Sequence, residues 1–196
     1  MYRTNGPMET KMAKPKVPLE QAVQAITDTF RTHGYEGASL ARLSQASGLG
    51  KSSLYHHFPK GKDDMAKAAR DLTVAQASEQ FIGQLRADGD PRQRLDAARR
   101  GLEDFYAGGE KACLVNHFGV LEAAEAIPGA AQAMAEAMIA AFTKLAADAG
   151  APMAEARDRG EQATADLEGA LVLSRALGTS QPFFRMLGRL EQTLLS

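Results

Sequence analysis

Hydrogen-bond donors gather in one short stretch of this chain, residues 48–65, which reads GLGKSSLYHHFPKGKDDM. The stretch holds three lysines, two serines, two histidines and one tyrosine. Such side chains donate hydrogen bonds to phosphate oxygens and to base edges in complexes of proteins with DNA. The sequence therefore predicts a surface that binds a polyanion, with its donors at Lys51, Ser52, Ser53, Tyr55, His56, Lys60 and Lys62.

The same stretch is a poor candidate for a catalytic or metal site. His56 and His57 are adjacent, so they lie about 100° apart around a helix. No carboxylate stands four residues away from either histidine to complete a ligand set, and His33 is isolated. We expect no metal, no cofactor and no catalytic residue, and the protein is predicted not to be an enzyme.

Cys113 is the best remaining candidate for reactivity, because His117 follows four residues later and lies one helical turn away. The pair could form a nucleophile with its base, or a redox sensor. A small buried thiol beside a polar neighbour is the commoner arrangement. With a single cysteine the chain cannot form an internal disulfide, which agrees with a reducing compartment.

Composition indicates a folded protein: the 196 residues are 44% hydrophobic and 24% charged, with a net charge of −1. Residues 1–70 carry eleven Lys and Arg against six Asp and Glu, whereas residues 71–196 carry twelve against eighteen. The amino-terminal part is therefore the one expected to face a polyanion. The first sixteen residues have no apolar segment typical of a signal peptide, and polar residues interrupt the Ala-rich run at 130–147. We expect a cytoplasmic protein with no membrane contact.

Helical periodicity runs through almost the whole chain, which predicts an all-α fold. The pattern predicts a helix over 19–34, a second that Ser39 caps and Gly48 ends, a third over 51–58, and a long fourth helix after a cap at Asp63. The second and third helices are separated only by residues 48–50, a spacing typical of a helix-turn-helix. From spacing alone, a helical hairpin with a solvated basic turn is the alternative.

Residues 39–65, SLARLSQASGLGKSSLYHHFPKGKDDM, resemble the DNA-binding signature of TetR-type (tetracycline-repressor-like) transcriptional regulators. The resemblance implies DNA contacts at Ser39, Lys51, Ser52, Ser53, Tyr55, His56 and Lys62, and a small core made by Leu43, Leu49, Leu54 and Phe58. Three positions depart from the family pattern: Gly50 in place of a capping Ser or Thr, Ser52 in place of Gly, and Gly61, which lengthens the turn.

The resemblance also implies the organisation of the protein. We expect a flexible basic arm or start-site extension at 1–16, a helix-turn-helix domain at 17–62, and a helical domain for effector binding and dimerisation at 63–196. The implied protein is a homodimer that binds a palindromic operator in double-stranded DNA and represses transcription until a small-molecule inducer releases it. Two alternatives are a redox-sensing regulator that acts through Cys113 and a helical adaptor that binds proteins.

Helical stripes rich in Met and Phe within residues 63–196 suit a plastic apolar ligand pocket, although such stripes are also common in plain cores. The candidate ligand residues are Phe105, Cys113, Asn116, His117, Phe118, Met138 and Phe142. The amphipathic segments 164–178 and 182–195 are predicted to pair with those of a second subunit in a four-helix bundle, with burial inside one subunit as the alternative. The candidate interface residues are Leu167, Leu171, Leu177, Phe183, Leu187 and Leu190.

Overall fold

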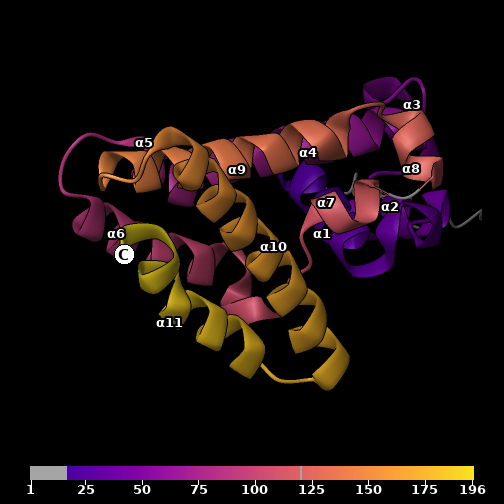
Figure 1. Ribbon diagram of the computed structural model, residues 1–196. Helices are drawn as coiled ribbons and strands as arrows, with labels where there is room; N and C mark the ends of the chain where they lie inside the picture. The colour runs from indigo at the N-terminus through magenta and orange to yellow at the C-terminus, as the bar shows by residue number, and fades with distance from the viewer. Residues whose placement is uncertain (1–16, 120) are drawn as a thin grey trace, which may run out of the picture.

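The computed structural model describes residues 17–119 and 121–196, and within these ranges all regular structure is helical, which confirms the predicted all-α fold. In chain order the elements are α1 (Leu19–Gly37), α2 (Leu40–Ser47), α3 (Lys51–His57), α4 (Lys62–Ala77), the π-helical turn η1 (Ser78–Ile82), α5 (Gly83–Arg86), α6 (Pro91–Phe105), the 3-10 turn η2 (Ala107–Gly109), α7 (Leu114–Phe118), α8 (Leu121–Ala126), α9 (Ala130–Asp148), α10 (Met153–Leu177) and α11 (Gln181–Leu195). Helices α1 to α3 gather at one end of the molecule, and α10 and α11 lie toward the other (Figure 1). None of the described helices is long and apolar enough to cross a membrane. The predicted arm at 1–16 lies outside the described residues.

Helices α2 and α3 form the predicted helix-turn-helix. The Ser39 hydroxyl accepts a hydrogen bond from the Arg42 N–H at 3.3 Å, which confirms the predicted cap. Gly48 ends α2 with a φ of 69°, a left-handed conformation that glycine adopts without steric cost. As predicted, the small core contains Leu43, Leu49, Leu54 and Phe58, all buried.

The start of α4 differs from the prediction, because Gly61 rather than Asp63 precedes its first residue. Asp63 lies in the first turn, where its carboxylate accepts a hydrogen bond from the Tyr35 hydroxyl of α1 at 2.5 Å. Asp64 accepts from the Lys60 N–H at 2.8 Å. These bonds tie the helix-turn-helix to the first turn of α4, so no flexible linker separates the two parts.

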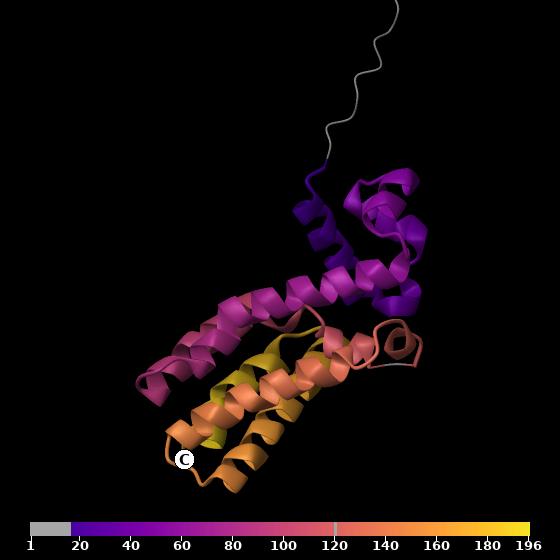
Figure 2. The same cartoon turned by 90° about the horizontal axis from the view of Figure 1, so that it is seen from above.

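The predicted long fourth helix is divided by the π-helical turn η1, which separates α4 from α5. Gly101 of α6 packs against this turn so closely that a Cβ atom there would lie 1.8 Å from the Gln80 carbonyl oxygen. A π-helical turn redirects the backbone groups of a helix and is frequent at functional sites. Helices α4 and α9 run alongside each other (Figure 2).

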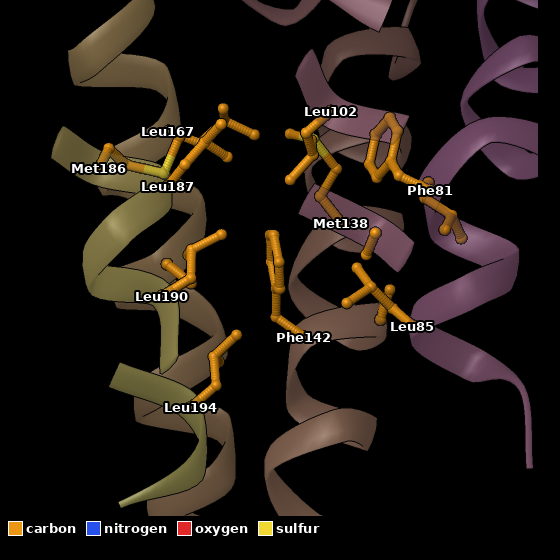
Figure 3. Close-up of a cluster of buried hydrophobic side chains, with 14 of the residues drawn as sticks. Phe81, Leu85, Leu102, Met138, Phe142, Leu167, Met186, Leu187, Leu190 and Leu194 are labelled. Carbon is orange, nitrogen blue, oxygen red and sulfur yellow. The ribbon is translucent and has the colours of Figure 1, made fainter. Parts of the chain in front are cut away.

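The carboxy-terminal helices enclose a large apolar core. In Figure 3, Phe142 of α9 lies in the middle of this core. Leu167 of α10 and Leu187 and Leu190 of α11 lie to one side of it, and Leu102 and Phe81 lie to the other. Helices α7 and α8 are short, and α10 begins at Met153, before the predicted amphipathic segment 164–178.

Five of the six predicted dimer-interface residues are buried in this core within one chain, so their side chains are not exposed for contact with a second subunit, and pairing of the two helices stays a prediction. The buried residues are Leu167, Leu171, Phe183, Leu187 and Leu190. The physical reason is that α10 packs on α9 and α11 within one chain, so the leucine stripes face inward. Leu177 differs from the others, because 66% of its surface is exposed.

Candidate nucleic-acid interface and cavity

Helix α3 presents a polar face to the outside, because Leu54 and the following Phe58 anchor it to the small core. Five residues predicted to contact DNA lie on its exposed surface: Lys51, Ser52, Ser53, Tyr55 and His56. Lys60 is also exposed, in the turn that follows. These six residues therefore lie on one exposed surface. A helix with hydrogen-bond donors along its outer side can enter the major groove of DNA.

Two residues of the predicted set are engaged within the protein. The Ser39 hydroxyl caps α2. The Lys62 Nζ lies 4.2 Å from the centroid of the Tyr35 ring and 3.9 Å from a Glu36 carboxylate oxygen. A cation held over an aromatic face and beside a carboxylate is partly neutralised, so Lys62 braces the turn before α4.

Gly61, which departs from the family pattern, adopts a backbone conformation in this turn that favours glycine. Its φ of 63° disfavours other residues, and a Cβ atom there would meet the Tyr55 ring at 3.5 Å. Gly61 therefore lets the turn pass under Tyr55, which stays exposed on the surface of α3.

A cavity of about 160 Å³ lies between α4, η1, α6 and α9. Its walls are mainly apolar and include Thr73, Phe81, Phe105, Tyr106, Cys113 and Met138. Beside it a more open groove of about 510 Å³ shares Val74, Met134 and Ala137 with the cavity. The two volumes thus follow the seam between α4 and α9.

Three of the seven predicted ligand residues line the cavity: Phe105, Cys113 and Met138. The other four lie elsewhere, because three of them point from α7 toward α1 or α10, and the fourth, Phe142, points from α9 into the carboxy-terminal core. Asn116 donates to a Glu168 carboxylate oxygen at 2.7 Å, and the His117 Nε2 lies 3.0 Å from the Arg31 carbonyl oxygen. Phe118 packs edge-on against Phe30, and Phe142 is fully buried in the carboxy-terminal core.

Sequence reasoning missed the other wall residues, among them Thr73, Phe81 and Tyr106. The Thr73 hydroxyl is buried and has no hydrogen-bond partner among the described residues. A polar residue at a buried position of a helix could have pointed to Thr73, but no local pattern distinguishes the two aromatic residues from ordinary core residues. Their position depends on which helices approach each other.

The surroundings of Cys113 keep its thiol protonated. Cys113 is 3% exposed, and the Tyr106 hydroxyl donates to its sulfur at 3.5 Å. Burial, followed by the charge of Glu168, raises the pKa of the thiol well above its ordinary value. Since the thiolate is the reactive form, these surroundings disfavour a redox role, which stays a prediction. The described residues hold no group of three side chains placed to bind a metal ion.

His117 connects the helical body with the helix-turn-helix. Its ring lies against the kink at Gly34, where a Cβ atom would lie 3.2 Å from Nδ1. Burial lowers the pKa of His117, although the bond to the Arg31 carbonyl opposes that effect. A neutral imidazole therefore sits between the two parts at neutral pH.

Comparison with known proteins shows which family the amino-terminal helices resemble. Residues 23–69 match the family model described as bacterial regulatory proteins, tetR family. The helix-turn-helix region of this chain is therefore of the TetR type. The matched range holds α2, α3 and most of α1, so it coincides with the polar surface described above.

Curated HTH-type transcriptional regulators are similar to this chain over part of their length. The HTH-type transcriptional regulator LmrA of Bacillus subtilis is 31% identical over 83 residues, which are 42% of this chain and 44% of LmrA. The HTH-type transcriptional repressor AcnR of Corynebacterium efficiens is 36% identical over 59 residues, 30% of this chain and 31% of AcnR. The chain thus spans less than half the length of these relatives.

Solved structures of TetR-type regulators share the whole fold. A TetR transcriptional regulator from Legionella pneumophila has a TM-score of 0.77 at 17% identity, over 94% of this chain and 100% of the other. The TetR family transcriptional regulator CifR, as a cysteine mutant in complex with 26-base-pair operator DNA, has a TM-score of 0.72 at 22% identity, over 93% of this chain and 98% of CifR. At such identities the likeness establishes the fold alone.

Proposed function

We propose that this protein is a transcriptional repressor that binds a palindromic operator as a homodimer and leaves it when a small molecule occupies the cavity. The observation that carries DNA binding is the exposed outer face of α3, with Lys51, Ser53 and Tyr55 held by a buried Leu54. Support also comes from the CifR structure, whose printed description includes operator DNA. Repression is proposed from the family resemblance and from relatives named as repressors.

The proposed dimer uses the outer side of α10 and α11. Four large apolar side chains are exposed there: Val172 (44%), Leu173 (53%), Leu177 (66%) and Phe184 (46%). An apolar surface rimmed by polar residues marks a protein interface. A two-fold dimer would place two α3 helices on one side, as a palindromic site requires.

The proposed effector is a small, mostly apolar compound. The cavity walls are apolar, and the Met134 and Met138 side chains can adapt to a ligand because they are unbranched. The unpartnered Thr73 hydroxyl could hydrogen-bond one polar group of the compound. Because Thr73 and Phe81 belong to the α4–η1 segment that starts next to α3, a ligand that pushes this segment changes the spacing of the two α3 helices.

DNA binding is tested with Lys51→Ala. We expect this variant to lose about 1–3 kcal/mol of affinity if Lys51 contacts a base, and to change the preferred sequence. The matched control is Arg157→Ala, because Arg157 lies on α10 and pairs with Glu161 of the same helix at 2.6 Å. Fluorescence anisotropy on DNA found by footprinting around its own gene measures both variants over a range of salt concentrations. Equal, salt-insensitive affinity for any duplex would contradict the proposal.

Effector response is tested by thermodynamic linkage. A compound that binds the cavity and prefers the DNA-free conformation should weaken operator binding about 5- to 150-fold, a coupling of about 1–3 kcal/mol. Operator DNA must then weaken binding of the compound by the same factor, which calorimetry with and without DNA measures. Ala77→Phe, which fills the cavity, should abolish binding of the compound. If the compound binds Ala77→Phe with unchanged affinity, it does not use this cavity.

A further inference from the structure

A second, polar cleft lies where α1 meets α10, on the other side of Phe105 from the apolar cavity. Its volume is about 260 Å³, and its walls come from α1, the segment between η2 and α7, and α10. We propose that this cleft binds inorganic phosphate in a form that keeps a proton. The proposal does not depend on the function proposed above.

Three cationic side chains from three different segments line this cleft: Arg31, Lys111 and Arg175. None of the three forms an ion pair with a carboxylate of the described residues. The walls carry three cations against two carboxylates, Asp28 and Glu110, so the cleft has an excess of positive charge and favours an anion. An oxyanion can accept hydrogen bonds from all three at once.

Arg31 is the central observation, because it is 5% exposed and its Nε and Nη2 atoms are buried without a hydrogen-bond partner. A buried charge with unsatisfied donors is costly unless something accepts from it. The guanidinium is also held in place, since its Cζ lies 4.6 Å from the centroid of the Phe105 ring. A pre-positioned guanidinium loses little conformational freedom when it binds an anion.

The choice of phosphate follows from two carboxylates in the same walls, Asp28 and Glu110. Asp28 accepts from the Gln24 amide through Oδ2, but its Oδ1 is buried without a partner. An anion that only accepts hydrogen bonds would face this oxygen unfavourably. Hydrogen phosphate has a hydroxyl to donate to Asp28 and further oxygens to accept from the cations, whereas sulfate at neutral pH has no proton to donate.

The cleft has room for such an ion. A water molecule occupies about 30 Å³ in the liquid, so 260 Å³ holds a phosphate and some accompanying water. A bound phosphate would join Arg31 of the helix-turn-helix part to Arg175 of α10. Occupancy would therefore stiffen the contact between the two parts of the molecule.

Isothermal titration calorimetry of the full chain with phosphate, and separately with sulfate, tests the proposal at constant ionic strength. We expect saturable binding of one phosphate per chain, and sulfate binding weaker by about tenfold because one charged hydrogen bond is missing. Arg175→Gln and Lys111→Gln should each weaken phosphate binding by about tenfold. These residues are exposed, so the variants are suited to test binding without the folding risk of replacing the buried Arg31.

Two further variants make the test specific. Arg157→Gln removes an exposed cation of α10 that is paired with Glu161 and absent from the cleft walls, and it should bind phosphate like the unaltered chain. Asp28→Asn should bring the affinities for phosphate and sulfate within about threefold, because the charged acceptor for the phosphate proton is gone. The proposal is overturned if phosphate does not bind saturably, if sulfate binds equally well, or if Arg175→Gln and Lys111→Gln bind phosphate unchanged.

Discussion

Gly101→Ala is expected to lower the free energy of unfolding by about 3 kcal/mol or more, because the added methyl group has no space. Its Cβ would lie 1.8 Å from the Gln80 carbonyl oxygen and 2.6 Å from the Gln80 carbonyl carbon. Both atoms belong to the backbone of the π-helical turn, so no side-chain rotation can relieve the overlap. Either α6 or η1 must move, and both contribute walls to the cavity.

Urea unfolding followed by circular dichroism measures this effect. Gly188→Ala is the matched control, because Gly188 also lies within a helix but a Cβ there meets nothing within 4 Å. Alanine favours helix over glycine by up to about 1 kcal/mol, so the control should be as stable as the unaltered chain or more stable. Equal stability of Gly101→Ala and the unaltered chain would show that α6 and η1 do not approach as described.

Leu177→Glu is expected to produce a folded monomer that has lost specific DNA binding. Leu177 is 66% exposed on α10, so a carboxylate there costs one chain little, but in a dimer it would be buried unpaired in the apolar interface. Sedimentation velocity should show half the mass of the unaltered protein, with the same circular dichroism spectrum. Operator affinity should fall by more than about tenfold, because one chain can contact only one half-site.

Leu190→Ala provides the contrast on the neighbouring helix. Leu190 is 2% exposed and faces the core on the side of Phe142 (Figure 3), so its truncation should lower the free energy of unfolding by about 2–5 kcal/mol without a direct effect on the interface. If Leu177→Glu remains a dimer, or if it loses as much stability as Leu190→Ala is expected to lose, the outer face of α10 is not the interface.

The leucines of α10 illustrate what sequence pattern leaves open. Leu167, Leu171, Ser174 and Leu177 recur at spacings of four, three and three, which fit a helix, yet the first three are buried and the last is exposed. A helix with apolar residues on more than one side can bury either side, and the helices that pack against it determine which side is buried. Here α9 and α11 cover one side, which leaves Leu173 and Leu177 outside.

Which residues line the cavity also depends on how the helices pack. Asn116 and His117 are the most conspicuous polar residues of their segment, but α7 directs them to Glu168 and to the Arg31 carbonyl. Thr73 and Phe81 line the cavity because a π-helical turn follows α4. No residue type in the sequence predicts such a turn. Residues far apart in the chain meet at one wall only once the helices have packed.

The sequence by itself determined the helical fold class and the helix-turn-helix, because both depend on short-range physics, and residues 39–65 carried the resemblance to TetR-type regulators. Ser39 caps a helix through a bond to Arg42, Gly48 ends it through a left-handed φ, and Leu54 is buried since it recurs at helical spacing. Only the tertiary structure decided which side of α10 faces outward, which side chains line the cavity, and that Arg31 and Arg175 share a cleft. The physical reason is that burial and charge convergence depend on how distant helices pack, whereas caps and turns are made within a few residues.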